Sequence, residues 1–475
     1  MYRILKIKVE NHEYLKNFEL DLTLMNGRAA STVIFAGENG SGKTQILNLI
    51  KDFIANTPSE GYRPPNGTIN CTLEFQILID DKIYSTRLAK DSNGIVNMQI
   101  QDESGKSPPT SVLPFKAISS RSETNFIPRI IEFVSNSDVD KLTNKSKIFE
   151  SSDDSATAIK QLFIEINNKD NSDHHSWEEE NPGMGRPPKE FCEKKRMSRF
   201  NTAFTYMFGD DLKFSKIEEQ DVLFVKNDQK FSIDNLSSGE KQIVFRGGHL
   251  IQNLNLFKDC TVIIDEPELS IHPKWQEKLL GFYRKLFSDG INDSQIFIAT
   301  HSDHVVKSAL ENDNTIIIKI KIDNNNTITG EKIYKNGRGN ILPRVTLGEV
   351  KWRIFDIPTL DFHCALFGYL QSIDIKTSTG NTVQLPLDKN GNSCSHSINE
   401  LDDILEFLTA PAVPANLKNT HKYSPARIGD KTLCTYVRNQ IDHPESSDRE
   451  CEIRDIDLRT SIDFMSSICV LNNTP

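Results

Sequence analysis

The feature that most constrains this chain is a glycine-rich segment at residues 37–44, with the sequence Gly-Glu-Asn-Gly-Ser-Gly-Lys-Thr. The apolar run at residues 32–35 before it is typical of a buried strand, and apolar residues recur at helical spacing over residues 46–54. A strand, a glycine loop and a helix in this order surround phosphate oxygens with backbone N–H groups and the positive end of the helix. The segment therefore predicts a nucleoside triphosphate site in an α/β protein.

The loop also predicts roles for individual side chains. The charge of Lys43 is expected to reach the β- and γ-phosphates, and the hydroxyl of Thr44 is expected to hold Mg²⁺. The backbone supplies the other contacts, because glycines let the chain pass close to the phosphates. The nucleotide-binding residues predicted in this segment are Gly37, Asn39, Gly40, Gly42, Lys43 and Thr44.

Two later apolar runs end in polar side chains that suit the same chemistry. Residues 261–264 lead into Asp265 and Glu266, and residues 296–300 lead into His301. Acids at the carboxyl end of a central strand lie where α/β sheets bind ligands. Asp265 is predicted to coordinate Mg²⁺ and Glu266 to act as the general base that polarises the attacking water. The second run is expected to be the next strand of the sheet, which places His301 at the same edge, within reach of a γ-phosphate.

A fourth motif lies between the glycine loop and the acidic pair and reads Leu-Ser-Ser-Gly-Glu at residues 236–240. Ser237 and Glu240 fit the capping-box pattern that opens a helix. The N-terminus of such a helix presents N–H and O–H donors to an anion, so Ser237 and Gly239 are candidate nucleotide contacts.

Together, and in this order, the four motifs resemble those of the SMC-like branch of the ABC-type ATPases. The resemblance implies that the ligand is ATP with Mg²⁺ and that His301 is the switch histidine. It also implies that Ser237 and Gly239 of one subunit close over the ATP held at Lys43 of another, in a homodimer or higher oligomer. The match has departures: Ser238 replaces the usual second glycine, and the strand near residues 117–121 offers no Q-loop glutamine.

Four segments narrow the resemblance to the ATPase subunit of Septu-type and retron-associated anti-phage systems: residues 236–248, 264–276, 299–302 and 436–445. In those systems the ATPase works beside a separately encoded HNH nuclease. The resemblance therefore implies an ATP-hydrolysing subunit that controls a partner nuclease and contacts DNA, RNA or retron nucleic acid. Two alternatives stay open: a self-contained ribonuclease toxin restrained by the ATPase, and a DNA-repair ATPase.

The expected architecture is an α/β, ABC-type ATPase head at residues 1–340, with a mixed or parallel sheet and a helical insertion at about 125–225. Residues 341–475 are expected to form a mainly α-helical interaction or effector module. The insertion lacks sustained heptads, so no long coiled-coil arm is expected. The polar segment at 167–189 is predicted to be a loop, and the basic cluster at 194–199 is interpreted as a solvated helix face rather than a phosphate-binding patch.

Three amphipathic helices are predicted in the C-terminal part, around residues 362–370, 401–408 and 433–441, with a linker at 410–422. Arg438 and His443 resemble the short motif of HEPN ribonucleases, in which a histidine transfers protons and an arginine stabilises the phosphorane. The other interpretation is structural: Arg438 is a surface residue, and His443 ends a helix where its charge favours the dipole.

The net charge and the hydropathy of the chain argue against a general nucleic-acid-coating protein and against a membrane-spanning protein. The net charge of −10 argues against a general nucleic-acid coat, since binding of that kind depends on Lys and Arg. No apolar run approaches the length of a membrane span, and the N-terminal residues show no signal-peptide pattern. We therefore expect a cytoplasmic protein that does not enter a membrane.

Overall fold

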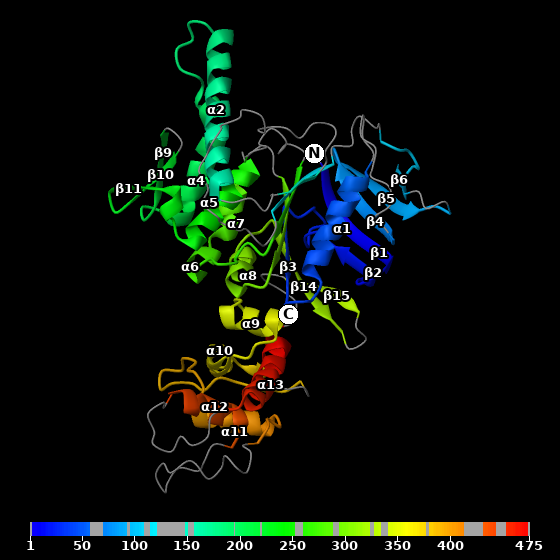
Figure 1. The fold of residues 1–475 in the computed structure, drawn as a ribbon. Helices are drawn as coiled ribbons and strands as arrows, with labels where there is room; N and C mark the ends of the chain where they lie inside the picture. Colours follow the sequence, from blue (N-terminus) through cyan, green and yellow to red (C-terminus); the bar gives the residue numbers. More distant parts are fainter. Residues whose placement is uncertain are drawn as a thin grey trace. The chain divides into compact units, whose positions relative to one another are not determined.

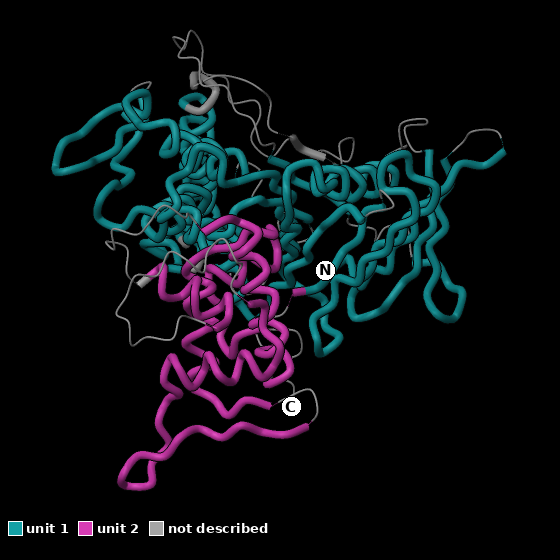
Figure 2. Tube along the Cα trace, turned by 90° about the horizontal axis from the view of Figure 1, so that it is seen from below, with its two compact units in different colours: residues 1–332 teal, residues 333–475 magenta. Residues whose placement is uncertain are grey.

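The computed structural model describes the chain over the following residues: 2–57, 70–92, 96–108, 115–120, 148–150, 156–193, 195–218, 221–251, 260–287, 294–323, 327–333, 341–376, 380–412, 431–442 and 453–473. The chain divides into two compact units, residues 1–332 and residues 333–475, which are coloured separately in Figure 2. No helix within the described ranges is long and apolar enough to cross a membrane.

A seven-stranded sheet forms the centre of the first unit, in the order β15-β14-β3-β13-β12-β7-β8 (Figure 1). Its strands are β3 (Thr32–Ala36), β7 (Lys116–Ser120), β8 (Ile148–Glu150), β12 (Cys260–Asp265), β13 (Gln295–Thr300), β14 (Thr315–Ile322) and β15 (Ile328–Ile333). The pairs from β14 to β8 are parallel. All residues of β3 and β13 are buried, which explains why these strands are continuous apolar runs in the sequence.

A second, antiparallel sheet has the order β2-β1-β4-β5-β6. Its strands are β1 (Tyr2–His12), β2 (Lys16–Asp21), β4 (Thr72–Ile79), β5 (Lys82–Lys90) and β6 (Val96–Asp102). In β4 and β5, buried residues alternate with more exposed ones, as in an antiparallel sheet that packs on a core with one face. The register of β1 shifts between Ile4 and Lys6, and this irregularity lets the consecutive residues Ile4 and Leu5 both be buried.

Helix α1 (Lys43–Asn56) joins the two sheets through one apolar cluster. Its residues at helical spacing, Ile46 through Ile54, are buried as predicted. Phe53 stacks on Phe75 of β4, with 3.9 Å between the ring centroids. The glycine loop therefore stands on a rigid support, because the helix that follows it is packed on both sheets.

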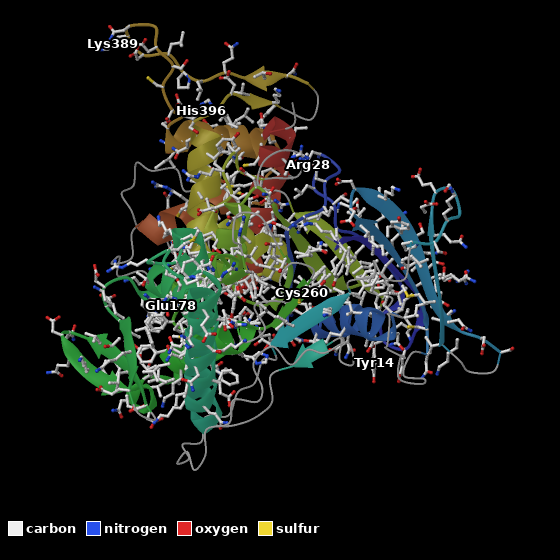
Figure 3. The ribbon with its side chains drawn as sticks, turned by 90° about the horizontal axis from the view of Figure 1, so that it is seen from above. Tyr14, Arg28, Glu178, Cys260, Lys389 and His396 are labelled. Atoms are coloured by element: carbon white, nitrogen blue, oxygen red, sulfur yellow. The ribbon has the colours of Figure 1, made fainter. Side chains whose placement is uncertain are left out.

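The remaining elements of the first unit are α2 (Ala156–Glu180), α3 (Lys189–Glu193), α4 (Arg196–Phe208), β9 (Lys213–Glu218), β10 (Asp221–Lys226), β11 (Gln229–Ser232), η2 (Ile233–Asn235), α5 (Ser238–Ile251), α6 (Pro273–Gln276), α7 (Leu279–Phe287) and α8 (Asp303–Leu310). Strands β9–β11 form a three-stranded sheet that the sequence did not lead us to expect. The second half of α2 extends away from the body of this unit in Figure 1, and Glu178 near its end is labelled in Figure 3.

Helix α2 corrects the prediction of a loop at residues 167–189. The chain is helical as far as Glu180, and the loop is limited to residues 181–188. Asn and Asp have low helix propensity, but side chains one turn apart attract each other here, as in Lys169–Asp173 at 2.9 Å and His174–Glu178 at 3.4 Å. The first half of the helix is also anchored, because residues 162–166 are buried.

The basic cluster at 194–199 is not the solvated helix face that was predicted. Arg196 is 2% exposed, and its guanidinium lies 3.3 Å from carboxylate oxygens of both Asp170 and Asp173 on α2. Arg199 is also buried. The cluster ties α4 to α2, and this role depends on a long-range pairing that local composition does not reveal. Lys194 lies outside the described residues.

The second unit is mainly helical. Its elements are α9 (Leu347–Phe355), α10 (Leu360–Gln371), β16 (Ile375–Lys376), β17 (Thr382–Val383), α11 (Ile398–Phe407), α12 (Leu433–Asp442) and α13 (Asp455–Asn473). The three predicted helices correspond to α10, α11 and α12, whereas α9 and α13 were missed. One apolar cluster holds the five helices together. Most of the predicted linker at 410–422 lies outside the described residues. The predicted fold class, an α/β head and a helical C-terminal part, is confirmed.

Candidate functional site

The order of the central sheet brings three of the four motifs to one edge. Strand β13 lies between β3 and β12, and its Ala299 pairs with Phe35 on one side and with Asp265 on the other. Because these strands are parallel and in register, their carboxyl ends meet at the same edge of the sheet. The glycine loop, the acidic pair and His301 follow directly from those ends, so the predicted neighbourhood of β12 and β13 is confirmed.

Lys43 fills the inside of the glycine loop. Its Nζ donates to the carbonyl oxygens of Gly37 at 3.0 Å and Glu38 at 2.7 Å, and the residue is 5% exposed. Burial lowers the pKa of Lys43, and the nearby carboxylates oppose that shift. Gly40 and Gly42 have φ angles of 80° and 97°, a backbone conformation that side chains with a Cβ rarely adopt. Asn39 and Gly40 are exposed at the rim of the loop.

Thr44 and Asp265 form a pair of oxygen donors. The Thr44 hydroxyl lies 3.0 Å from Oδ2 and 3.2 Å from Oδ1 of Asp265. Burial raises the pKa of the Asp265 carboxyl. Hydroxyl and carboxylate oxygens are hard ligands that suit Mg²⁺. The donor set therefore fits the cation that the sequence led us to expect.

Glu266 has a strained backbone. Its φ angle is 42°, in the left-handed region, and its N–H donates to the Ala299 carbonyl at 2.9 Å. Its carboxylate Oε1 lies 3.5 Å from Nδ1 of His301. The structure thus places the predicted base beside the predicted switch histidine, at the edge where the strands end.

Arg246 supports this backbone, and sequence reasoning missed it. The residue lies on α5, is 1% exposed, and donates to the carbonyl oxygens of Asp265 at 3.2 Å and Glu266 at 3.3 Å. The sequence did contain an indication of this role. Arg246 lies within the buried run Val244-Phe245-Arg246-Gly247, and a buried arginine is expected to have a partner.

Glu268 is the second residue that sequence reasoning missed. It lies in the turn after β12, and its side chain is 2% exposed. It accepts hydrogen bonds from the Thr300 hydroxyl at 2.6 Å and from the backbone N–H of His301 at 2.7 Å. The acid was visible in the sequence three residues after Asp265, but only the fold shows that it turns inward.

The helix start at residues 236–240 has the predicted capping box. The Ser237 N–H donates to Glu240 Oε2 at 2.8 Å, and the Glu240 N–H donates to Ser237 Oγ at 3.4 Å. Gly239 is required by a close approach, because a Cβ there would lie 2.8 Å from the Ser270 carbonyl oxygen. Within the described part of the chain, no hydrogen bond joins Ser237 or Gly239 to the glycine loop.

The remaining candidates belong to the second unit or lie outside the described residues. Arg438 lies on α12, bonds Asn439 at 3.0 Å, and is 6.0 Å from the Phe367 ring centroid. His443 lies outside the described residues, as does Arg121. The rest of the segment at 117–121, where the Q-loop was sought, forms β7.

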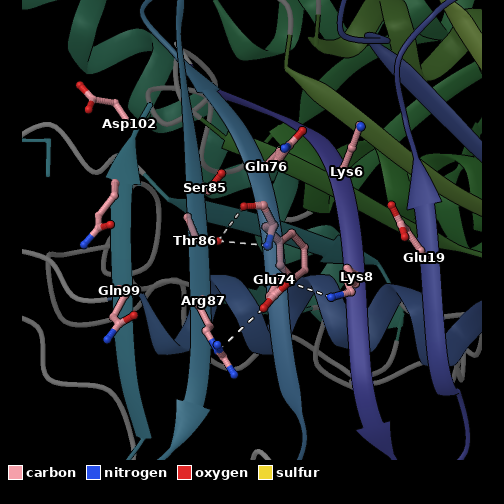
Figure 4. Close-up of a pocket in the computed structure, with 12 residues that line it drawn as sticks. Lys6, Lys8, Glu19, Glu74, Gln76, Ser85, Thr86, Arg87, Gln99 and Asp102 are labelled. Carbon is pink, nitrogen blue, oxygen red and sulfur yellow. Dashed lines mark hydrogen bonds and ion pairs between the residues drawn. The ribbon is translucent and has the colours of Figure 1, made fainter. Parts of the chain in front are cut away.

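A hollow of about 410 Å³ lies on the polar face of the antiparallel sheet (Figure 4). Its charged side chains neutralise one another: Glu74 is 3.2 Å from Lys8 and 3.8 Å from Arg87. None of the four sequence motifs contributes a residue to its lining. The hollow therefore does not belong to the predicted nucleotide site.

Comparison with known families gives one match that covers most of the first unit. The family model described as "AAA domain, putative AbiEii toxin, Type IV TA system" matches residues 33–307. That range contains the glycine loop, the capped helix start, the acidic pair and His301.

Two named relatives match shorter segments. The chain is 29% identical over 106 residues to the retron Vc95 probable ATPase of Vibrio cholerae serotype O1 biovar El Tor, which is 20% of each chain. It is 24% identical over 164 residues to the Septu protein PtuA of Bacillus thuringiensis, which is 32% of this chain and 37% of that protein. The matched segments therefore span well under half of either relative.

Comparison with solved structures gives matches to two SMC heads. The SMC head domain from Thermotoga maritima has 12% sequence identity and a TM-score of 0.40, covering 70% of this chain and 99% of that one. The Smc head domain from Pyrococcus furiosus, bound to the C-terminal domain of ScpA, has 14% identity and a TM-score of 0.39, covering 70% and 97%.

Proposed function

The chain belongs to the family of AAA domains described as putative AbiEii toxin, Type IV TA system, and we propose that it is the ATP-hydrolysing subunit of an anti-phage defence system. One observation carries the proposal. The central sheet gathers Lys43, Thr44, Asp265, Glu266 and His301 at the carboxyl ends of three adjacent strands. In the proposal, this set supplies a cation for the phosphates, a pair of oxygen donors for Mg²⁺, a base and a second polar group.

In the proposed reaction, Lys43 exchanges the loop carbonyls for the β- and γ-phosphates of ATP. Thr44 and Asp265 would hold Mg²⁺, which supplies positive charge against the phosphate oxygens when it is bound. Glu266 accepts a proton from the attacking water, and His301 donates a hydrogen bond to the γ-phosphate. The bond between the β- and γ-phosphates breaks, and the products are ADP and phosphate.

Two such chains are proposed to share each nucleotide. Ser237 is exposed at the start of α5, and its oxygen accepts the Glu240 N–H, which leaves the hydroxyl hydrogen free to be donated. Within the described residues, Ser237 makes no hydrogen bond to the glycine loop of its own chain. This supports a contact between Ser237 and the nucleotide of the other chain, across a dimer interface. Ser237 and Gly239 of one head would therefore complete the site of the other.

The relatives suggest the setting in which the ATPase works. One is named as a retron ATPase and the other as a Septu protein. We propose a separately encoded nuclease of HNH type as the partner, nucleic acid as a further ligand, and the cytoplasm as the location. Residues 341–475 are proposed as the interaction module, and residues 1–340 as the ATPase head.

Phosphate release is the decisive measurement. The wild-type chain with ATP and Mg²⁺ should release phosphate, and Glu266→Gln should bind ATP but turn over roughly 10² to 10⁴ times more slowly, the usual effect of losing a general base. Equal turnover by the two proteins would refute the role of Glu266. If the wild-type chain instead cleaves tRNA without a partner, the ribonuclease alternative is the correct one.

A further inference from the structure

The buried carboxylate of Glu268 organises the turn that carries His301. Its Oε1 accepts the Thr300 hydroxyl at 2.6 Å and the His301 N–H at 2.7 Å. The Thr300 oxygen in turn accepts the N–H of Ser302 at 3.0 Å. One carboxylate oxygen therefore fixes three consecutive residues between the end of β13 and the start of α8.

The same oxygen faces the imidazole ring. Nδ1 of His301 lies 3.3 Å from Glu268 Oε1 and 3.5 Å from Glu266 Oε1. It is buried and makes no hydrogen bond within the described residues, so these two carboxylates are acceptors within its reach. The two ring nitrogens point in different directions, so a ring whose Nδ1 faces the acids has Nε2 available for another partner. The side chain of His301 is 36% exposed, which leaves room for an anion to approach it.

The hydrogen bonds from the Thr300 hydroxyl and the His301 N–H do not by themselves require a glutamate at position 268, because the amide oxygen of a glutamine would accept them as well. Glu268 nevertheless keeps a carboxylate at a site where its side chain is 2% exposed. Its second oxygen, Oε2, is buried and has no hydrogen-bond partner among the described residues. A buried carboxyl oxygen without a partner is costly unless a nearby donor can use it. The imidazole of His301 is such a neighbour.

We propose that Glu268 is a positioning residue for ATP hydrolysis, which holds the His301 imidazole with Nδ1 toward the acids and Nε2 toward the γ-phosphate. The inference rests on the proposed function. Glu268 acts through His301 and does not touch the nucleotide. Removal of its charge should therefore slow the chemical step and leave ATP binding nearly intact.

Glu268→Gln is the informative variant, because its amide oxygen can still accept the Thr300 hydroxyl and the His301 N–H. We expect kcat to fall roughly 10- to 100-fold, the usual effect of changing a group that orients another, with little change in KM. The matched control is Glu277→Gln. It also removes an acid beside a histidine, since Glu277 Oε1 is 3.2 Å from His304 Nδ1, but at an exposed position. This control should turn over like the wild type.

A double-mutant cycle tests whether Glu268 works through His301. In a His301→Ala background, the change Glu268→Gln should cost little further activity, because the group that it orients is gone. An equal loss of kcat in both backgrounds would overturn the proposal, as would a wild-type kcat in Glu268→Gln. If Glu268→Gln does not fold, as judged from its thermal unfolding, Glu268→Asp is put through the same cycle with the same expected and opposing outcomes.

The proposed function fails in a different way. If the wild-type chain releases no phosphate, or if release is unchanged in Glu266→Gln, then ATP hydrolysis at this site is refuted. If release depends on Glu266 but not on Glu268, only the positioning role is refuted.

Discussion

The ammonium group of Lys43 lies among carbonyl oxygens, close to several carboxylates and away from water. Coulombic attraction by Glu266, Glu268 and Asp265 favours its charged form, whereas burial opposes it. A bound triphosphate adds negative charge at this point, so much of the binding energy should depend on this one side chain.

Lys43→Ala should weaken ATP binding by roughly 10- to 100-fold, since hydrogen bonds to charged groups contribute about 1.5–3 kcal/mol. Calorimetric titration with ATP measures the change. Lys82→Ala, at an exposed position on β5, is the control that should bind like the wild type. Unchanged affinity in Lys43→Ala would mean that the glycine loop is not the nucleotide site.

Arg246 should affect both stability and activity. Arg246→Met removes the donors to the carbonyl oxygens of Asp265 and Glu266, and buried acceptors left without a partner cost about 1–3 kcal/mol. Urea denaturation should show this loss, and phosphate release should slow because the acids are less well held. Arg87→Met, on the polar face of the antiparallel sheet, provides a control for the loss of an exposed arginine. A variant as stable as the wild type would show that Arg246 does not hold this backbone.

These residues show how far the sequence could predict the site. Lys43, Asp265 and His301 were predictable because each directly follows a recognisable apolar strand or glycine loop. Arg246 and Glu268 were not, because their roles depend on contacts with elements that are distant along the chain. Their side chains bond backbone groups, and residue type does not specify such partners.

At the scale of elements, the helices and strands that were predicted correctly are those whose structure follows from a single property, such as burial on both faces. Strands β3, β12 and β13 are buried on both faces, and continuous apolar runs reveal such burial. The second half of helix α2 was missed because two signals disagree. Its composition is that of a loop, whereas pairs one turn apart and the contact of Asp170 with Arg196 favour the helix. The contact between α2 and α4 therefore stabilises a helix that the local composition does not predict.

The helical unit contains a histidine that should make its stability depend on pH. His363 on α10 bonds Ser461 through Nε2 at 2.8 Å, and burial lowers its pKa to about 3, from an ordinary value of 6.5. Between these values the unfolded chain binds a proton that the folded chain does not. Stability should therefore be unaffected above pH 6.5 and should decrease as the pH falls below it.

From pH 7 to pH 5 this histidine should lower the free energy of unfolding by about 2 kcal/mol, at 1.36 kcal/mol for each pH unit below the unfolded pKa. Urea denaturation of the wild type and of His363→Gln at both pH values measures the effect. The variant should lose about 2 kcal/mol less than the wild type. His304→Gln, at a partly exposed pair, should behave like the wild type, and equal pH dependence in all three proteins would contradict the prediction.

At the scale of the whole molecule, the proposed sharing of nucleotides makes assembly depend on ATP. The Glu266→Gln protein should form more dimer, or a more compact dimer, with ATP than with ADP, because hydrolysis no longer separates the heads. Small-angle scattering distinguishes the two states. Ser237→Glu should abolish the difference, since it places a negative charge against the phosphates. Identical scattering curves with both nucleotides would exclude the shared site.

The C-terminal unit is expected to act through contacts rather than as the main catalyst. If Arg438 and His443 only complete a helix, His443→Ala should cost about 1 kcal/mol of stability or less and preserve protection against phage. Protection assays and thermal unfolding of the same variant decide the question. A folded protein that has lost protection would favour the ribonuclease alternative.

The contacts of α5 have a consequence for how two heads respond to ATP. The N-terminus of this helix carries Ser237, and about two and a half turns further along Arg246 holds the carbonyl groups of Asp265 and Glu266 in the same chain. If Ser237 of one head contacts the nucleotide bound by the neighbouring head, binding of that nucleotide changes the position of α5, and with it the positions of Asp265 and Glu266 in the first head. Thermodynamic reciprocity then requires the second site to influence the first equally. Turnover by such a pair should be cooperative, with a sigmoidal dependence on ATP, and a mixed dimer with one Lys43→Ala head should work at well below half the normal rate.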